Sequence, residues 1–499
     1  MYFVALATDY DGTLAEDGIV APSTLSALRS LKESGRKAIL VTGRELPDLR
    51  AVFAEIGCFD LVVAENGALL YDPSTGEEVA IGAEPPSVFV ERLRERQVPI
   101  SVGRSIVATW VPHEGTVLDV VRELGLELQI IFNKDAVMVL PPGVNKATGL
   151  AAALTRLQLS PLNVVGIGDA ENDHAFLQAS GCAVAVANAL PMVKADAEIV
   201  TQGARGAGVA ELIGRLIEDD LTGVTRRTRR QGVELGLALD GTAEMTQPQD
   251  SLLIAGSSGG GKSTVASGLI ERIAAAGFQF CVIDPEGNYA GLQSAVTVGD
   301  VKGPPPLSQV MELVEQPDQN LVVDLTGVEL ADRPGFFAEL MPKLSELRTR
   351  TARPHWLLID EAHHMLPPVL GSASVTLPRE FFGTILVSVR PDHIARPALA
   401  AVTRLITVGA DAASTMRSFF ERLETQVPEL EERPLAHGEA LLWDHETRAV
   451  RRLCTIRPRT RAALEGERMI DPTRPDAGDK LNTAKTAAPA VPPRHSPAR

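Results

Sequence analysis

Residues 7–14, ATDYDGTL, close the first apolar run of the chain and place two carboxylates two positions apart. The run YFVALAT predicts a buried strand, and the stretches STLSALRSLKESG, KAILVTG and LVVAENG then alternate helical and strand patterns. This alternation predicts a parallel sheet with helices on both faces. Asp9 and Asp11 should therefore lie on one side of the first strand, at the end where open parallel sheets bind ligands.

Further polar residues follow strands or begin helices in the same part of the chain. VTGR places Thr42 and Gly43 after the second strand, where a hydroxyl and backbone N–H groups can hold phosphate oxygens. GVNKATGL offers Lys146 as a cation at the start of a helix. GDAENDHAF adds Asp169 and Asp173, whose carboxylates suit Mg²⁺. Together these residues predict one phosphate site with a magnesium ion.

The ordered motifs DYDGTL, VTGR, the helix-start lysine and GDAENDHAF resemble those of the haloacid dehalogenase superfamily. A cap between the second and third motifs makes the chain similar to the Cof-type, class IIB phosphatases. The resemblance implies that Asp9 is the nucleophile, forming an aspartyl-phosphate, and that Asp11 protonates the leaving alcohol and then activates water. It also implies Mg²⁺ held by Asp9, Asp169 and the backbone carbonyl of Asp11, with support from Asp173. A small sugar phosphate or a phosphoglycolate-like metabolite is the expected substrate.

A second phosphate motif, LLIAGSSGGGKSTVA, occupies residues 252–266. It matches G-x-x-x-x-G-K-[ST], follows an apolar strand and opens a helix, which is the context that a P-loop requires. The alternative is a glycine-rich loop without a ligand. The P-loop interpretation predicts that Lys262 reaches the β and γ oxygens of ATP and that Ser263 is a Mg²⁺ ligand. The predicted nucleotide-binding residues are Gly256, Gly259, Gly260, Gly261, Lys262, Ser263 and Thr264.

The stretch PHWLLIDEAHHML supplies the acidic partner that such a loop needs. Asp360 is predicted to support Mg²⁺ through water, and Glu361 to polarise the attacking water. Two adjacent carboxylates favour a hydrolase over a small-molecule kinase, which would need an acceptor site and a lid. His363 and His364 suggest a metal site, but a structural or coupling role is the better interpretation.

The stretches CVIDPEGNYAGL and ILVSVRPDHI resemble the HerA/FtsK-type ATPases, with Asn288 where Glu is usual and Val389 where Gln is usual. The resemblance covers roughly residues 233–456. It implies a homo-oligomeric ring that moves DNA or protein, in which an arginine reaches the γ-phosphate of the next subunit. Arg404 and Arg417 are candidates, although a surface arginine paired with a nearby acid is the better interpretation of each.

Length and composition set the organisation of the chain. The 499 residues are too many for one core and predict several domains. The expected fold is α/β, with a doubly wound parallel sheet carrying an α+β cap and a second α/β P-loop domain. We expect a phosphohydrolase domain over 1–222 with its cap at roughly 80–144, a basic linker and short strand over 223–245, an ATPase domain over 246–457, and a disordered tail over 458–499.

Charge, cysteine usage and hydropathy limit the partners and the compartment. A formal net charge of −16 disfavours a generally basic, nucleic-acid-coating surface, so nucleic acid is not the default partner, although a local basic patch would leave DNA open. The four scattered cysteines argue against a zinc site and a disulfide framework. No segment approaches the length of a membrane span, and a cytoplasmic protein without a membrane partner is expected.

Three functions remain in competition at this level. The first is a phosphatase for a small phosphorylated metabolite, with an ATP-binding and ATP-hydrolysing half that controls it. The second is a DNA or protein translocase with an accessory phosphatase domain. The third is a nucleotide-binding scaffold in which neither site turns over. The acidic balance favours the first.

Overall fold

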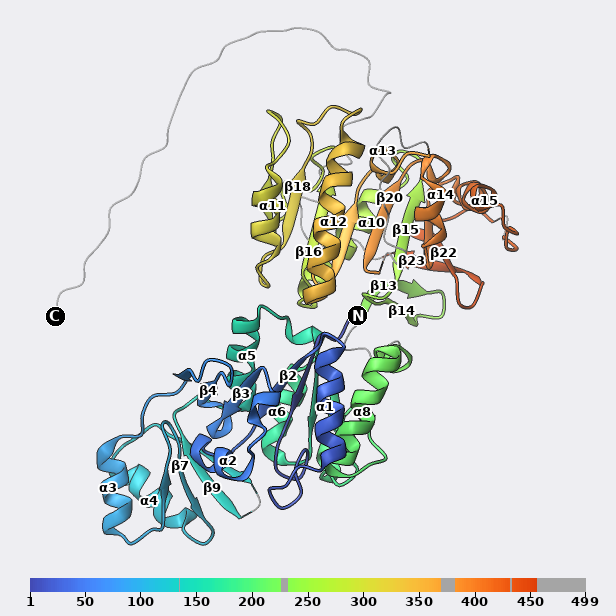
Figure 1. The fold of residues 1–499 in the computed structure, drawn as a ribbon. Helices are drawn as coiled ribbons and strands as arrows, with labels where there is room; N and C mark the ends of the chain where they lie inside the picture. The colour runs from blue at the N-terminus through green and yellow to red at the C-terminus, as the bar shows by residue number, and fades with distance from the viewer. Residues whose placement is uncertain (134, 226–231, 369–381, 431–432, 456–499) are drawn as a thin grey trace, which may run out of the picture.

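A computed structural model of the chain describes residues 1–133, 135–225, 232–368, 382–430 and 433–455. These residues form three sheets (Figure 1). The arginines of the expected linker, within 226–231, and the expected disordered tail lie outside the described residues. The expected boundaries between the domains therefore stay predictions.

The first sheet has eight strands in the order β12-β11-β10-β1-β2-β3-β4-β5. The strands from β12 to β3 are parallel, and β4 and β5 extend the sheet as an antiparallel hairpin that the sequence pattern did not indicate. The strands are Ala5–Thr8, Lys37–Val41, Leu61–Ala64, Leu69–Tyr71 and Glu78–Ala80 for β1 to β5, and Val164–Gly168, Cys182–Ala185 and Ile199–Val200 for β10 to β12. The helices are α1 (Pro22–Glu33), α2 (Leu46–Val52), α5 (Lys146–Leu157), α6 (His174–Ala179), α7 (Pro191–Asp196), α8 (Arg205–Asp219) and α9 (Thr222–Thr225).

A small cap lies between β5 and α5 along the chain. Its antiparallel sheet has the order β6-β7-β9-β8 and is covered by two helices with an apolar core of their own. The elements are α3 (Ser87–Glu95), β6 (Ser101–Val102), β7 (Val107–Trp110), α4 (Glu114–Glu123), β8 (Gln129–Asn133) and β9 (Ala136–Leu140). Strand β8 was not expected from the sequence, because QIIFN is too short and too uniformly apolar to show a period.

The third sheet has eleven strands in the order β14-β13-β23-β22-β21-β15-β20-β19-β16-β18-β17. The part from β21 to β17 is parallel, and the rest is antiparallel. The strands β13 to β23 are Val233–Ala238, Ala243–Thr246, Ser251–Gly256, Phe280–Asp284, Val296–Val298, Leu321–Asp324, Trp356–Ile359, Thr384–Ser388, Arg404–Val408, Glu439–Asp444 and Val450–Thr455. The helices α10 to α15 are Lys262–Ala275, Leu307–Val314, Arg333–Thr351, Ala362–Met365, Arg396–Ala400 and Ala412–Leu423.

Strand β15 shows why this sheet is buried on both faces. Its side chains alternate between two apolar cores: Leu252 and Ile254 pack with α10, whereas Leu253 and Ala255 pack with α12 and α15. An uninterrupted apolar strand is what a parallel sheet between two helical layers requires. The expected fold class, two successive α/β units of which the first carries an α+β cap, is confirmed.

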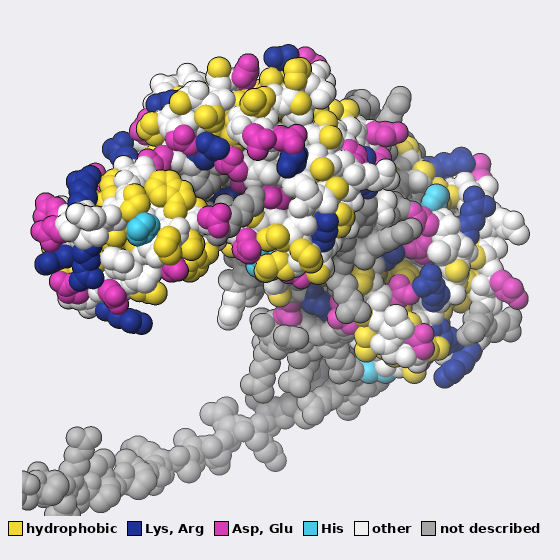
Figure 2. All heavy atoms as spheres, turned by 90° about the horizontal axis from the view of Figure 1, so that it is seen from below, with side chains coloured by type: hydrophobic (Ala, Val, Ile, Leu, Met, Phe, Trp, Pro, Cys, Tyr) yellow, Lys and Arg dark blue, Asp and Glu magenta, His cyan; other side chains and the backbone are white. Residues whose placement is uncertain are grey.

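The surface carries charges of both signs. On the face shown in Figure 2, Lys and Arg side chains are interspersed with Asp and Glu, and hydrophobic side chains gather on the lobe formed by the cap. The exposed apolar residues of the cap include Trp110, Val111 and Phe132. Among the described residues, no helix is long and apolar enough to cross a membrane.

Candidate active site and nucleotide site

Parallel pairing brings the acidic residues of the first half to one edge. Strand β1 pairs with β10 on one side and with β2 on the other, so Asp9, Asp169 and Thr42 follow three adjacent strands. Asp9 and Asp169 are almost fully buried. Gly12 has a φ of +86°, and a side chain there would collide with the Asp169 carboxylate, so this turn requires glycine.

Lys146 lies between two of these carboxylates. It begins α5, whose Asn145 cap accepts hydrogen bonds from the N–H groups of Ala147 and Thr148. The Lys146 Nζ is 2.6 Å from an oxygen of Asp9 and 2.6 Å from an oxygen of Asp173, and all three side chains are buried. Burial alone lowers the pKa of Lys146, but Asp173 and Asp9 more than offset this and raise it, so the lysine is a fixed cation.

The donor set at this edge fits a hard divalent cation. Carboxylate oxygens of Asp9, Asp169 and Asp173 lie within 4.8 Å of one another. Burial, and then the negative charge of Asp173, raise the pKa of Asp9 to about 8. A bound cation would relieve the repulsion between these carboxylates. Asp173 accepts from the N–H groups of Asp169 and Ala170 at 2.8 and 2.9 Å as well as from Lys146, so it is placed to support the cluster.

Asp11 is held by a residue to which the sequence analysis gave no role. The Arg44 guanidinium donates two hydrogen bonds of 2.7 Å to the two Asp11 oxygens, and the Arg44 backbone N–H donates to the Thr42 hydroxyl at 3.1 Å. Arg44 thereby joins the first and second motifs. The signal was present in VTGR, whose fourth residue is this arginine, but a sequence does not show which carboxylate an arginine meets.

The second predicted site is built on the turn between β15 and α10. Gly259 and Gly261 have φ values of +73° and +96°, and Gly261 caps the helix that Lys262 begins. A side chain at Gly256 would collide with the carbonyl of Val408 in the neighbouring strand. The Lys262 Nζ donates to the Ser257 carbonyl at 3.1 Å, folded onto its own loop. Backbone N–H groups at the start of a long helix are the cradle that a nucleotide phosphate needs.

The two carboxylates of the second predicted site, Asp360 and Glu361, directly follow strand β19. Burial raises the pKa of Asp360 to about 7, and the Asn288 amide donates to its carboxylate at 3.2 Å. Asn288, the departure from the HerA-type pattern, therefore contacts the predicted metal-supporting residue directly. Glu361 has a φ of +41°, an uncommon conformation for a residue with a long side chain. Burial raises its pKa as well.

His363 connects Glu361 to the end of β20. Its Nδ1 is 3.3 Å from a Glu361 oxygen and 3.2 Å from the Ser388 hydroxyl. Burial lowers the pKa of His363 to about 4, so the ring is neutral near pH 7. Among the described residues, the one cluster of three or more His, Cys, Asp or Glu side chains close enough to share a metal ion is Asp9, Asp169 and Asp173. His363 and His364 are not part of it, and the close contact of His363 with Glu361 favours the coupling role.

Residues 6–103 and 124–213 match the sequence-family model of haloacid dehalogenase-like hydrolases. A phosphoglycolate phosphatase from Methanothermobacter thermautotrophicus is 33% identical over 223 residues, which are 43% of this chain and 98% of that protein. The chain belongs to the haloacid dehalogenase-like hydrolases. Its N-terminal half is a phosphatase domain of this family, here called the phosphatase half.

A second sequence relative agrees with this assignment. Phosphoglycolate phosphatase 2 from Saccharolobus solfataricus is 30% identical and is matched over 43% of this chain and 92% of its own length. A solved haloacid dehalogenase-like hydrolase from Bacteroides thetaiotaomicron is 19% identical, with a TM-score of 0.38 and coverage of 43% of this chain and 99% of that one. Residues 249–433 match the model of the HerA helicase central domain, and this part is called the HerA-like half.

Within the phosphatase half, a buried carboxylate ties the cap to the core. Glu65 accepts hydrogen bonds from the backbone N–H groups of Arg104, Ser105 and Ile106 at 2.9, 2.8 and 3.2 Å. A side chain at Gly103 would approach the Glu65 carboxyl to 2.8 Å, so the turn between β6 and β7 requires glycine there. The sequence analysis gave Glu65 no role, and nothing in the sequence indicated that this glutamate holds the cap.

The buried ion triad of the phosphatase half should carry a large part of its stability. We expect Lys146→Met to lower the free energy of unfolding by about 3–5 kcal/mol, because it leaves two buried carboxylates without their cation. The measurement is urea denaturation in the presence of a chelator. Lys37→Met is the matched control, since Lys37 is half exposed beside Asp60 and should cost less than about 1 kcal/mol. Equal losses in the two variants would contradict this reading of Lys146.

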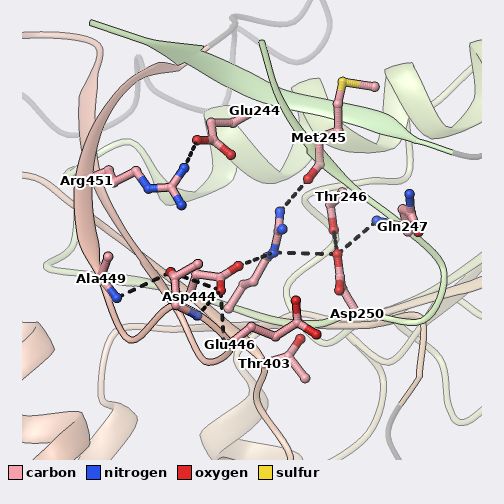
Figure 3. A network of polar contacts seen from close by, with 12 residues as sticks. Glu244, Met245, Thr246, Gln247, Asp250, Thr403, Asp444, Glu446, Ala449 and Arg451 are labelled. Atoms are coloured by element: carbon pink, nitrogen blue, oxygen red, sulfur yellow. Dashed lines mark hydrogen bonds and ion pairs between the residues drawn. The ribbon is translucent and has the colours of Figure 1, made fainter. Parts of the chain in front are cut away.

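The two candidate intersubunit arginines differ in their surroundings. Arg404 lies at the start of β21, far along the strand from the P-loop, and its guanidinium is 3.1 Å from Asp444 and 3.6 Å from Asp250. Figure 3 shows Asp250 and Asp444 in this network together with Met245, whose carbonyl also accepts from Arg404. Arg404 is therefore paired with nearby acids, which is the interpretation that the sequence analysis preferred. Arg417 is exposed on α15.

Proposed function

We propose that the phosphatase half hydrolyses a small phosphomonoester, either a phosphoglycolate-like acid or a sugar phosphate, through an aspartyl-phosphate on Asp9. The observation that carries this proposal is the buried placement of Lys146 between Asp9 and Asp173. A cation fixed 2.6 Å from the nucleophile can bind the transferring phosphoryl group. Two relatives of this half are named phosphoglycolate phosphatases, which supports a small phosphorylated acid as the substrate.

The residues of the site divide the two chemical steps between them. Asp9 attacks phosphorus as the P–O bond to the leaving group breaks, and Asp11 gives its proton to the departing alcohol. Asp11 then takes a proton from the water that attacks phosphorus and frees Asp9. Arg44 donates to both Asp11 oxygens and so holds this carboxyl group in place for both steps, while Thr42 and the Gly43 N–H hold phosphate oxygens.

Asp9, Asp169 and the backbone carbonyl of Asp11 would hold Mg²⁺, with Asp173 in support. The ion supplies charge neutralisation between the anionic carboxylate and the anionic ester. The test is phosphate release from a panel of phosphoglycolate, hexose phosphates and nucleoside monophosphates, with Mg²⁺ or with a chelator. Turnover of one small ester that stops with the chelator supports the proposal. Turnover that is unchanged by the chelator counts against the metal, and no turnover of any ester counts against the phosphatase.

We further propose that the HerA-like half binds and hydrolyses ATP. Lys262 would contact the β- and γ-phosphates, Ser263 and Asp360 would hold Mg²⁺, and Glu361 would polarise the attacking water. The glycine-lined turn before α10 and the match to the HerA central domain support this assignment. The same match favours a translocase as the second candidate. ATP turnover that rises severalfold on addition of duplex DNA would select it, whereas the mixed charges in Figure 2 favour no such response.

His363 should position Glu361 for this hydrolysis. We expect His363→Ala to lower kcat for ATP by about tenfold with little change in KM, because the substitution frees the Glu361 carboxylate without touching the phosphate cradle. Steady-state phosphate release from ATP measures both constants. His437→Ala, which removes an exposed histidine of the same half, should leave both unchanged. A rise in KM alone would show that His363 supports binding instead.

A further inference from the structure

The two halves meet at the starts of their strands. On the phosphatase side the contact is made by the Tyr2 ring, which faces His355, by Asn163, which precedes β10, and by the end of α5. On the HerA-like side it is made by Ala352, Arg353 and His355, in the segment between α12 and β19. Gln279, which precedes β16, holds Arg353 and His355 from within the same half. Figure 1 shows the N-terminus between the two sheets, with the cap at one end of the molecule and α13 at the other.

One histidine at this contact has a fully determined hydrogen-bond pattern. The backbone N–H of Gln279 can only donate, and it donates to Nδ1 of His355 at 2.9 Å. Burial lowers the pKa of His355 to about 3, so the ring is neutral and its proton sits on Nε2. Nε2 therefore donates to Oδ1 of Asn163, 3.0 Å away in the other half. The Asn163 amide nitrogen then donates to the Tyr2 carbonyl at 3.0 Å, which fixes the orientation of the amide.

An arginine makes the second polar contact. Arg353 is fully buried, and its guanidinium donates to the carbonyl of Gln158, at the end of α5, at 2.7 Å. It also donates to the Gln279 side chain at 2.9 Å and to the Glu315 carbonyl at 3.1 Å within its own half. Separation of the halves would break the hydrogen bond from Arg353 to Gln158 and expose a guanidinium group that is otherwise buried, so this arginine is part of the contact itself.

Apolar residues continue the contact on both sides. Leu162 of the phosphatase half packs against the apolar core around α10, and Ala352 of the HerA-like half packs against the core of the first sheet. Each core therefore extends across the contact. Domains joined by a mobile linker usually meet through polar, hydrated surfaces, and buried side chains with unique partners are typical of a permanent interface.

We propose that the phosphatase half and the HerA-like half are docked as one unit through the base joint, defined as Asn163, His355, Arg353, Gln279 and Leu162. The residues before β10 thus form an interaction surface, and the residues before β19 in the same chain bind to it. This inference does not depend on either activity.

The base joint places the two phosphate sites at opposite ends of the molecule. The run from Asn163 to Asp169 contains strand β10 (Val164–Gly168), and the run from His355 to Asp360 contains strand β19 (Trp356–Ile359). At about 3.3 Å per residue, the two runs and the joint separate the sites by on the order of 40 Å. A product of one site is therefore released to solvent and not passed directly to the other site.

The test is to cut the chain between the halves and ask whether they stay together. A specific protease site replaces residues within 226–231, and the cleaved protein is passed over a size-exclusion column at micromolar concentration. We expect the fragments to co-elute in a one-to-one complex. The Asn163→Ala, Arg353→Ala double variant should weaken the complex at least about tenfold, because each substitution leaves buried partners unpaired.

Controls separate a lost joint from a lost fold. Arg350→Ala removes an exposed ion pair between the last turn of α12 and Glu315 at the end of α11, and it should leave the complex intact. Circular dichroism of the uncut variants reports folding, and if the double variant does not fold, Asn163→Ala alone takes its place. Wild-type fragments that elute separately overturn the proposal, and so does a folded variant whose fragments stay together as tightly as the wild type.

Discussion

Asp9→Asn is expected to abolish phosphomonoester hydrolysis, with a fall in kcat of at least about a thousandfold. An amide cannot attack phosphorus, yet it keeps the shape of the carboxylate and an oxygen that accepts from Lys146. The fold should therefore survive, because burial already disfavours the charged form of Asp9. Phosphate release from the best ester of the panel measures the effect, with circular dichroism as the check on folding.

Asp17→Asn is the matched control for this experiment. It makes the same chemical change at an exposed position with a φ of +52°, a conformation that asparagine tolerates. We expect it to hydrolyse the ester at the wild-type rate. Asp9→Asn should also leave ATP hydrolysis unchanged. An Asp9→Asn protein that retains more than a tenth of the phosphatase activity would refute the role given to Asp9.

Lys262→Ala is expected to remove ATP hydrolysis by at least about a hundredfold and to weaken ATP binding, while phosphatase activity stays at the wild-type level. The side chain is the only part of the P-loop cradle that brings a full positive charge to the β- and γ-phosphates. Burial lowers the pKa of Lys262, and a bound ATP would give this lysine a phosphate partner. Phosphate release from ATP and a fluorescent-nucleotide titration measure the two effects.

Lys343→Ala on the exposed side of α12 is the control for Lys262. It removes the same charge from the same half and should change neither constant. If Lys262→Ala binds and turns over ATP normally, the glycine-rich turn is a loop without a nucleotide. If it instead lowers phosphatase activity, the two sites are coupled across the base joint in spite of their separation.

The strands and the residues that follow them were accessible to sequence reasoning. Apolar runs with polar ends predicted β1, β10, β15 and β19, and the residues after those strands include Asp9, Asp169 and Asp360. The reason is physical, because a parallel sheet gathers the carboxyl ends of its strands at one edge. The structure places these residues as predicted, and their catalytic roles stay predictions.

Contacts between segments far apart in the sequence could not be predicted from such local patterns. Arg44 meets Asp11 across 33 positions, and His355 meets Asn163 across 192. Such pairs depend on the relative placement of whole elements, which no local pattern encodes. Glu65 is a similar case, since its partners are backbone groups of a cap loop about 40 positions away. Arg404 pairs with two aspartates, as the preferred interpretation of this residue expected, but the sequence did not indicate which ones.

The central claim is that Asp9 becomes phosphorylated, and covalent trapping tests it most directly. The Asp11→Asn protein is mixed with ³²P-labelled acetyl phosphate, whose leaving group needs no proton, and is quenched in acid. Without the Asp11 carboxylate to activate water, the intermediate should accumulate. The account predicts label on the peptide that contains Asp9. Unlabelled protein, in a preparation whose wild type hydrolyses acetyl phosphate, would contradict it.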